Sequence, residues 1–140
     1  MPTKPLSQHE IRIRAVQTLY LLENQADETV ENALDFALGY DGDVRKVSEI
    51  PAFLTELIYG VRTKKAELDE KITTHLAKNW SVKRLAPINR VILRLGTFEI
   101  CFAETPRVVA INEAIELAKA FNDEKDAKFI NAILTKIEAE

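Results

Sequence analysis

Residues 87–103 read PINRVILRLGTFEICFA, and this stretch decides the fold. If it is helical, a narrow polar strip carries Asn89, Arg90 and Arg94. One apolar stripe carries Ile88, Val91, Ile92, Leu95, Phe98 and Phe102, and a second, largely apolar face carries Leu93, Gly96 and Ile100. A helix that is apolar nearly all round is normally the buried centre of a domain. We therefore expect the rest of the chain to pack around residues 87–103.

The flanking segments also have helical periodicity. Thr105 and Pro106 are expected as the N-cap and first residue of the next helix, whose inward residues are Ile111, Ala114, Ile115, Ala118 and Phe121. A short connection at 122–126 precedes a last helix with Phe129, Ile130, Ile133, Leu134 and Ile137. Upstream, helices are expected at about 28–38, from Pro51 as the first residue, and at about 65–77. Gly60 or residues 62–65 would bend or divide the last two.

The segment EIRIRAVQTLY, residues 10–20, is the one place where a strand competes with a helix. Its apolar residues alternate with Arg12 and Arg14, as in a half-buried strand. The pattern continues without Gly or Pro to Glu23, which is too long for a typical strand. Ser7 and Glu10 fit a capping box. We predict an all-α protein, a bundle of six to seven helices in a single domain over residues 1–140.

Composition narrows the class of protein. Four glycines, five prolines and a single cysteine argue against turn-rich β folds, disulfide frameworks and cysteine-based zinc sites. The amino terminus lacks the apolar run of a signal peptide, so a soluble, cytoplasmic protein without a membrane segment is expected. The net charge is −3, but residues 23–49 carry eight acidic side chains against two basic ones, and residues 78–98 carry five cations and no acid. These segments are a polarised surface or ordinary solvated helix faces.

No catalytic constellation is present in the sequence. Cys101 falls within the apolar helix, where a buried thiol is expected, and neither a P-loop nor a dinucleotide fingerprint occurs. Glu113 and Glu116 could share a metal, but they lack a histidine partner on the helix and fit a solvated face better. We predict a protein that is not an enzyme and that needs no cofactor or metal.

Two groups of residues suggest binding. Arg12 and Arg14, with Lys4 upstream, lie near a helix amino terminus and suit phosphate, although arginines on a surface helix are common. The second group surrounds the turn between the last two helices: Phe121, Asn122, Lys125, Lys128 and Phe129. Aromatic rings, an amide and lysines can stack an unpaired base and hold its backbone. The alternative is that both phenylalanines are core residues closing a helical hairpin.

Three segments resemble the NusB family of bacterial transcription antitermination factors. They are RAVQTLY (14–20), NRVILRLGTFEI (89–100) and VAINEAIELAKAFNDEKDAKFINAIL (109–134), in order over nearly the whole chain. The resemblance implies two packed helical sub-bundles without catalytic activity. It also implies pairing with NusE, a small-subunit ribosomal protein. The pair would bind the single-stranded boxA element of nascent ribosomal RNA leaders and help to modify elongating RNA polymerase to resist termination. A homodimer stays an open alternative.

The resemblance also assigns residues. The RNA-contacting set it implies is Lys4, Arg12, Arg14, Arg94, Phe121, Asn122, Lys125 and Lys128. The set expected to contact NusE is Tyr20, Asn89 and Leu93. Because Arg12 and Arg14 stand about 200° apart around a helix, only one can face a given phosphate, and Arg12 is the expected one.

The chain departs from the family pattern at several positions. Gln8 and His9 stand where many relatives have arginines, which predicts weaker or more NusE-dependent RNA binding. Asn89 lies near a commonly acidic position, and Asn122 replaces a common glycine at a helix end, where asparagine tolerates the left-handed conformation. Two other hypotheses are an RNA-binding domain detached from a ribosomal RNA cytosine methyltransferase and a helical scaffold that binds proteins only.

Overall fold

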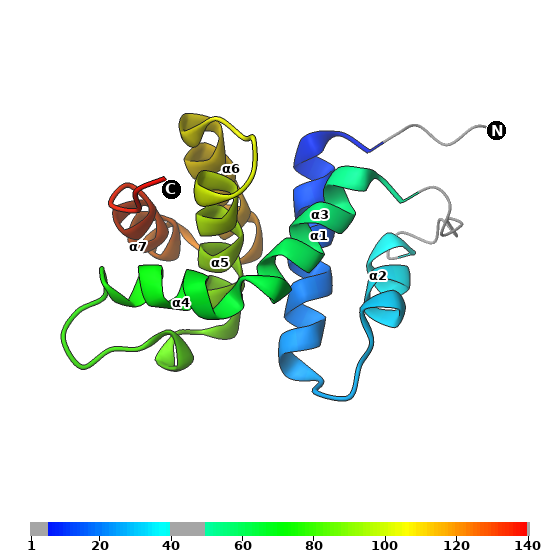
Figure 1. Cartoon of the computed structure of the whole chain (residues 1–140), viewed down its shortest axis with the longest axis horizontal. Helices are drawn as coiled ribbons and strands as arrows, with labels where there is room; N and C mark the ends of the chain where they lie inside the picture. Colours follow the sequence, from blue (N-terminus) through cyan, green and yellow to red (C-terminus); the bar gives the residue numbers. More distant parts are fainter. Residues whose placement is uncertain (1–5, 40–49, 140) are drawn as a thin grey trace. The chain divides into compact units, whose positions relative to one another are not determined.

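The computed structural model describes residues 6–39 and 50–139. Within these ranges the chain contains no strand and forms seven α-helices, which confirms the all-α prediction (Figure 1). The helices are α1 (Gln8–Asn24), α2 (Val30–Leu38), α3 (Ala52–Thr63), α4 (Lys65–Thr73), α5 (Pro87–Cys101), α6 (Arg107–Phe121) and α7 (Glu124–Leu134). A short 3-10 turn, η2 (Val82–Arg84), precedes α5. No helix of the described residues is long and apolar enough to cross a membrane.

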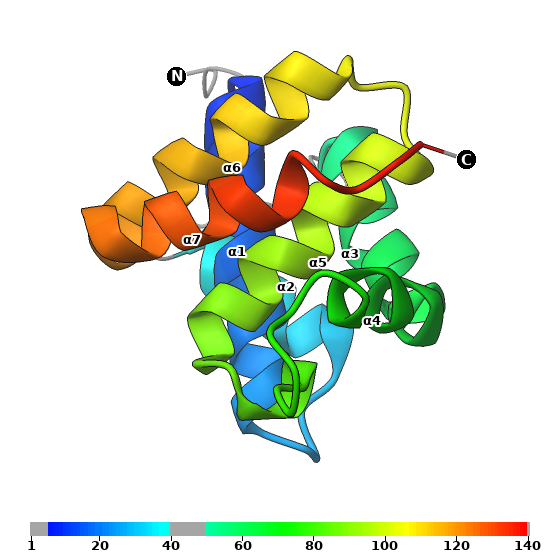
Figure 2. The same cartoon turned by 90° about the vertical axis from the view of Figure 1, so that its left-hand side faces the viewer.

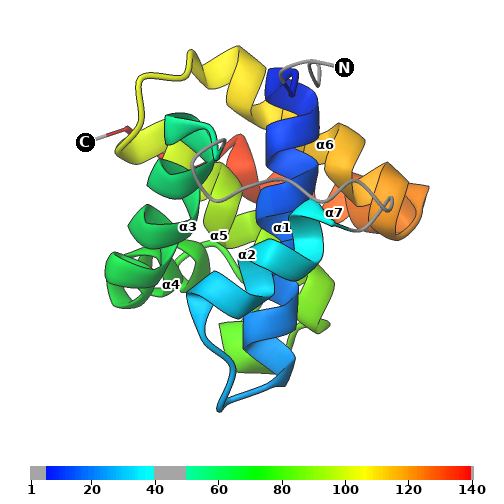
Figure 3. The same cartoon turned by 90° about the vertical axis from the view of Figure 1, so that its right-hand side faces the viewer.

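The chain separates into two compact units, Met1–Ile58 and Tyr59–Glu140. In the first unit, α1 and α2 lie side by side (Figure 3). Their shared core consists of Ile11, Ala15, Val16, Leu19, Val30, Ala33, Leu34, Ala37 and Leu38. The boundary between the units falls inside α3. A single domain over residues 1–140 stays a prediction.

The first helix begins where the sequence predicted. The Ser7 hydroxyl accepts a hydrogen bond from the Glu10 backbone N–H at 3.1 Å, and the Glu10 carboxylate accepts one from the Ser7 N–H at 3.1 Å. This capping box satisfies two backbone donors at the start of α1. The strand alternative for residues 10–20 is wrong, because α1 buries Ile11, Ala15 and Leu19 on one helical face.

In the second unit, α5 is the central helix. Every residue from Val91 to Ile100 is buried, as predicted for a helix that is apolar nearly all round. The helices α4, α6 and α7 pack against α5, and α6 and α7 lie side by side (Figure 2). Pro87 is at the start of α5, as predicted.

Two predicted helix starts are displaced by one residue. Pro106 is the N-cap of α6, and the Thr105 hydroxyl donates instead to Glu99 Oε1 at 2.8 Å. Pro51 lies outside α3, where its carbonyl accepts from the Leu54 N–H at 3.1 Å. The inward face of α6 is also rotated from the predicted one. Its buried residues are Ala110, Ala114, Leu117 and Ala118, whereas Ile111, Ile115 and Phe121 are only half-buried.

Gly60 does not bend α3. The helix continues to Thr63 and is divided from α4 at Lys64. Gly60 is a contact position, because a Cβ atom built on it would lie 2.2 Å from Cζ of Phe98. Phe98 is 5% exposed, so its ring has little room to move aside.

We expect Gly60→Ala to lower the free energy of unfolding by about 1–3 kcal/mol, because the clash with the ring of Phe98 outweighs the better helix propensity of alanine. Urea denaturation measures the change. In a Phe98→Leu background the same substitution is expected to cost less, since the smaller side chain leaves space. Equal stability of Gly60→Ala and the wild type would contradict this packing argument.

Candidate nucleic-acid interface

The turn between α6 and α7 presents polar side chains to solvent. Asn122, Lys125 and Lys128 are exposed, and Phe121 at the end of α6 is half-buried. Phe129 is also half-buried. Its exposure is therefore intermediate between that of a ring open for stacking and that of a core ring. We call Phe121, Asn122, Lys125 and Lys128 the α6–α7 turn surface. It combines a partly accessible ring, an amide and two ammonium groups on one short segment.

Hydrogen bonds connect this turn to the beginning of α5. The amide nitrogen of Asn122 donates to Asn89 Oδ1 at 3.3 Å. The amide nitrogen of Asn89 donates in turn to Asp126 Oδ1 at 2.8 Å. Asn89 is 6% exposed, so its amide holds the turn from the inside. A short interhelical turn is therefore fixed to the most buried helix of the second unit.

Asp123 caps α7 within the same turn. Its carboxylate accepts from the Asp126 backbone N–H at 2.9 Å, and this hydrogen bond lowers the pKa of Asp123 below the ordinary value of 3.8. A lowered pKa means that the charged cap stabilises the fold above about pH 4 and that this contribution is lost as the pH falls through the folded-state pKa. Asn122 precedes the cap with φ −142°, not in the left-handed conformation considered for it.

The arginines of α1 do not project into solvent. Lys4 lies outside the described residues, whereas Arg12 is 1% exposed, with its guanidinium 5.3 Å from the ring centroid of Phe53. Arg14 is 9% exposed, and its Nη1 donates to the carbonyl of Ala37 in α2 at 3.1 Å. This geometry corrects the expectation that Arg12 is the better phosphate ligand, because its guanidinium has no open face.

Arg94 is also committed to the interior. Its Nε donates to Asp69 Oδ1 at 2.7 Å and its Nη2 to Asp69 Oδ2 at 2.9 Å, which is a bidentate ion pair between α5 and α4. The side chain of Arg94 is 6% exposed and that of Asp69 29% exposed. This corrects the expectation that Arg94 contacts RNA, because its guanidinium already donates to both carboxylate oxygens of Asp69.

The residues predicted to contact NusE differ in their accessibility. Tyr20 on α1 is 42% exposed and can meet a partner. Asn89 is buried, and its amide makes the hydrogen bonds to Asn122 and Asp126 described above. Leu93 is 0% exposed, which corrects its placement on a partner surface. The apolar stripe of α5 is wide enough that Leu93 packs inward with its neighbours.

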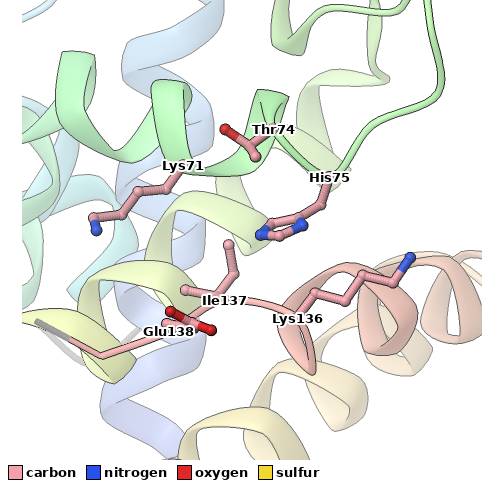
Figure 4. A pocket seen from close by; sticks show the side chains of 6 residues that line it. All are labelled: Lys71, Thr74, His75, Lys136, Ile137 and Glu138. Carbon is pink, nitrogen blue, oxygen red and sulfur yellow. The ribbon is translucent and has the colours of Figure 1, made fainter.

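A separate pocket of about 340 Å³ contains one of the two histidines (Figure 4). It is lined by Lys71, Thr74, His75, Lys136, Ile137 and Glu138. Figure 4 shows the Lys71 and Lys136 side chains pointing away from each other, so their ammonium groups do not converge on one ligand. Among residues 6–39 and 50–139 no group of three or more His, Cys, Asp or Glu side chains could hold a metal ion.

Cys101 is half-buried, not fully buried as predicted, and its thiol lies 3.4 Å from the carbonyl of Glu138. Sequence reasoning also missed Asp126, which accepts from Asn89 and fixes the turn. The spacing of Asp123 and Asp126 gives a signal for a capped helix start. Nothing in the sequence identifies the amide of Asn89 as its partner, because the two residues are 37 positions apart.

These features define an all-helical protein of two units with a fixed polar turn. Comparison with known proteins gives the family. The NusB family model matches residues 9–139. The transcription antitermination protein NusB of Enterococcus faecalis is 46% identical over 143 residues, covering 98% of this chain and 92% of that protein. The chain belongs to the NusB family.

Solved structures agree with this assignment. The structure of T. maritima NusB superposes with a TM-score of 0.82 at 30% identity, and the match covers 96% of this chain and 92% of that one. A crystal structure of antitermination factors NusB and NusE in complex with dsRNA matches with a TM-score of 0.79, covering 93% of this chain and 94% of that chain. Its identity of 24% supports the fold alone.

Proposed function

We propose that this protein is a transcription antitermination factor that binds single-stranded boxA RNA together with NusE. The observation that carries the proposal is the α6–α7 turn surface, in which Lys125 and Lys128 are exposed beside the amide of Asn122. Single-stranded RNA is recognised by stacking and edge contacts on such local surfaces, so a net charge of −3 is no obstacle. Membership of the NusB family and the similarity to the transcription antitermination protein of Enterococcus faecalis support the antitermination role.

The proposed mechanism uses binding and no catalysis. The two lysines neutralise phosphates, the half-buried ring of Phe121 can stack on a base, and Asn122 offers hydrogen-bonding groups. NusE would contact the first unit through Tyr20, the exposed member of the residues assigned to it. The assembled complex would act in the cytoplasm on elongating RNA polymerase and make it resist termination. Lys4 remains a proposed phosphate contact outside the described residues.

The proposal gives a structural role to three arginines, Arg12, Arg14 and Arg94. Each is buried and engaged within its own unit, so we assign them to holding the fold that presents the RNA surface. The RNA contacts then depend mainly on exposed lysines. Because Gln8 and His9 supply no permanent positive charge at the start of α1, NusE is expected to make a large contribution to the affinity.

We expect the double substitution Lys125→Ala, Lys128→Ala to weaken boxA binding about 5- to 30-fold, since two exposed phosphate contacts contribute about 0.5–1 kcal/mol each. The plot of log affinity against log salt has a negative slope, and its magnitude should decrease by about 1.4, the value for two phosphates on a single strand. Titration of a labelled boxA oligonucleotide, with and without NusE, measures both quantities.

The matched control is Lys65→Ala, Lys136→Ala, which removes two exposed lysines away from the turn and changes the net charge equally. It should leave the affinity within about twofold of the wild type. If both double variants weaken binding equally, the attraction is a general charge effect and the turn has no special role. If the wild type binds no boxA RNA in either condition, a protein-only scaffold becomes the better description.

A further inference from the structure

The connection between α4 and α5 exposes the only tryptophan of the chain (green in Figure 1). Trp80 is 49% exposed, although a ring of this size is usually largely buried. The guanidinium of Arg84 lies 5.3 Å from its ring centroid, in cation–π contact. An indole held partly open to solvent beside an arginine plane is a platform for stacking another flat group.

This connection is held in place by its own arginines. Nη1 of Arg84 donates to the carbonyl of Asn79 at 3.0 Å, and Nη1 of Arg90 lies 3.3 Å from the carbonyl of Lys83. Asn79 adopts φ 73°, the positive φ that lets the chain turn sharply before Trp80. The indole is therefore presented by a fixed segment, which reduces the entropy lost when a ligand binds.

A pocket of about 290 Å³ lies beside the platform. The residues that matter for its chemistry are Trp80, Arg84, Leu85, Asn89, Asp126 and Phe129. This volume lies just below the usual range for small-molecule sites, roughly 300–1,000 Å³, so it suits one flat ring system. Two aromatic rings and a leucine supply apolar walls, and the carboxylate of Asp126 supplies an acceptor that could read an N–H group on the edge of a base.

The charge around the pocket favours a ligand that carries phosphates over an apolar small molecule. Lys78, Lys83, Arg84 and Arg90 come from one segment in which residues 78–98 include no acidic side chain. Lys78 and Lys83 are exposed and available to phosphates. The acidic group facing the pocket is Asp126 on α7, and it already accepts a hydrogen bond from Asn89. A base and its flanking phosphates match this arrangement of a flat platform, one acceptor and peripheral cations.

The pocket and the α6–α7 turn surface are linked by hydrogen bonds. Asn89 and Asp126 line the pocket, and the same Asn89 accepts a hydrogen bond from Asn122 in the turn. These hydrogen bonds fix the turn relative to the pocket, so both can contact the same single strand.

We propose that the pocket beside Trp80 binds one unpaired nucleotide of the RNA. Its base stacks on the indole, and Lys83 with Arg84 faces its phosphates. This inference rests on the proposed RNA-binding function and adds a second contact site to it.

The sole tryptophan makes the test direct. A single-stranded boxA oligonucleotide should quench the fluorescence of Trp80 in parallel with the binding measured by anisotropy of the labelled RNA. Trp80→Ala should weaken binding roughly 5- to 150-fold, the range for loss of one stacked base. Trp80→Phe keeps a ring and should retain most of the affinity. Phe36→Ala is the control, because Phe36 is another exposed aromatic residue, 65% exposed, in the first unit.

Circular dichroism confirms that each variant is folded before affinities are compared. RNA binding by the wild type without quenching, together with unchanged affinity of Trp80→Ala, would overturn the Trp80 site while leaving the α6–α7 turn in place. Absence of any RNA binding by the wild type, with and without NusE, would overturn both proposals. A change in Trp80 emission caused by NusE alone, with no further change on adding RNA, would assign the pocket to the protein partner and reject the nucleotide.

Discussion

Arg12→Ala is expected to lower the free energy of unfolding by about 2–4 kcal/mol. The side chain is one of the largest that are fully buried, and its guanidinium lies against the ring of Phe53. Truncation to alanine leaves a cavity between α1 and its neighbours in the first unit and removes the packing of the long aliphatic stem. Thermal and urea denaturation followed by circular dichroism measure the loss.

Two companion measurements separate the structural role of Arg12 from an RNA contact. Arg12→Met keeps much of the volume without the charge, so it should be more stable than Arg12→Ala. At a temperature where Arg12→Ala is fully folded, its affinity for boxA RNA should stay within about twofold of the wild type. A tenfold loss in the folded variant would show that the guanidinium reaches RNA despite its burial.

The burial of the three arginines could not be predicted from the sequence, because it depends on contacts with residues distant along the chain. Arg12 meets Phe53, Arg14 meets the carbonyl of Ala37, and Arg94 meets a carboxylate 25 residues away. Local periodicity treats an arginine as a surface residue, since buried arginines are rare unless paired. The family resemblance strengthened that interpretation by assigning Arg12 and Arg94 to RNA.

Features with local causes were predicted well. The capping box of Ser7 and Glu10 and the proline at the start of α5 depend on residues within one helical turn. The all-round apolar character of residues 91–100 correctly identified the central helix. The face of α6 was harder to predict, because apolar residues occupy two sides of that helix, and only its packing against α5 and α7 buries Leu117 while leaving Ile111 and Ile115 partly accessible.

At the candidate site, too, some features could be predicted from the sequence and others could not. The exposed lysines and the amide of the α6–α7 turn were identified from composition and spacing, and they are exposed. Trp80 was not singled out, because a lone tryptophan in a connecting segment more often belongs to a core. Only its exposure in the structure and the adjacent pocket reveal the platform.

The second large effect is expected at the ion pair of α4 and α5. Asp69→Ala should lower the free energy of unfolding by about 2–4 kcal/mol, because it leaves the guanidinium of Arg94, 6% exposed, without its bidentate carboxylate. Arg94→Met should cost less, about 1–2 kcal/mol. In that variant the remaining carboxylate of Asp69, whose side chain is 29% exposed, can be hydrated, and the methionine fills the space of the arginine stem.

This asymmetry distinguishes a buried pair from a surface one. Two exposed partners would lose similar, small amounts, and the loss would shrink with added salt, whereas the effect at Asp69 should persist in 1 M salt. The double variant Asp69→Leu, Arg94→Met should recover much of the stability, because replacing both charges by apolar groups removes the unpaired one. Urea denaturation of the wild type, Asp69→Leu, Arg94→Met and the double variant gives the coupling energy. If Arg94→Met proved more costly than Asp69→Ala, the guanidinium would have to be stabilised by contacts other than Asp69, and the interior position of Arg94 would need a different explanation.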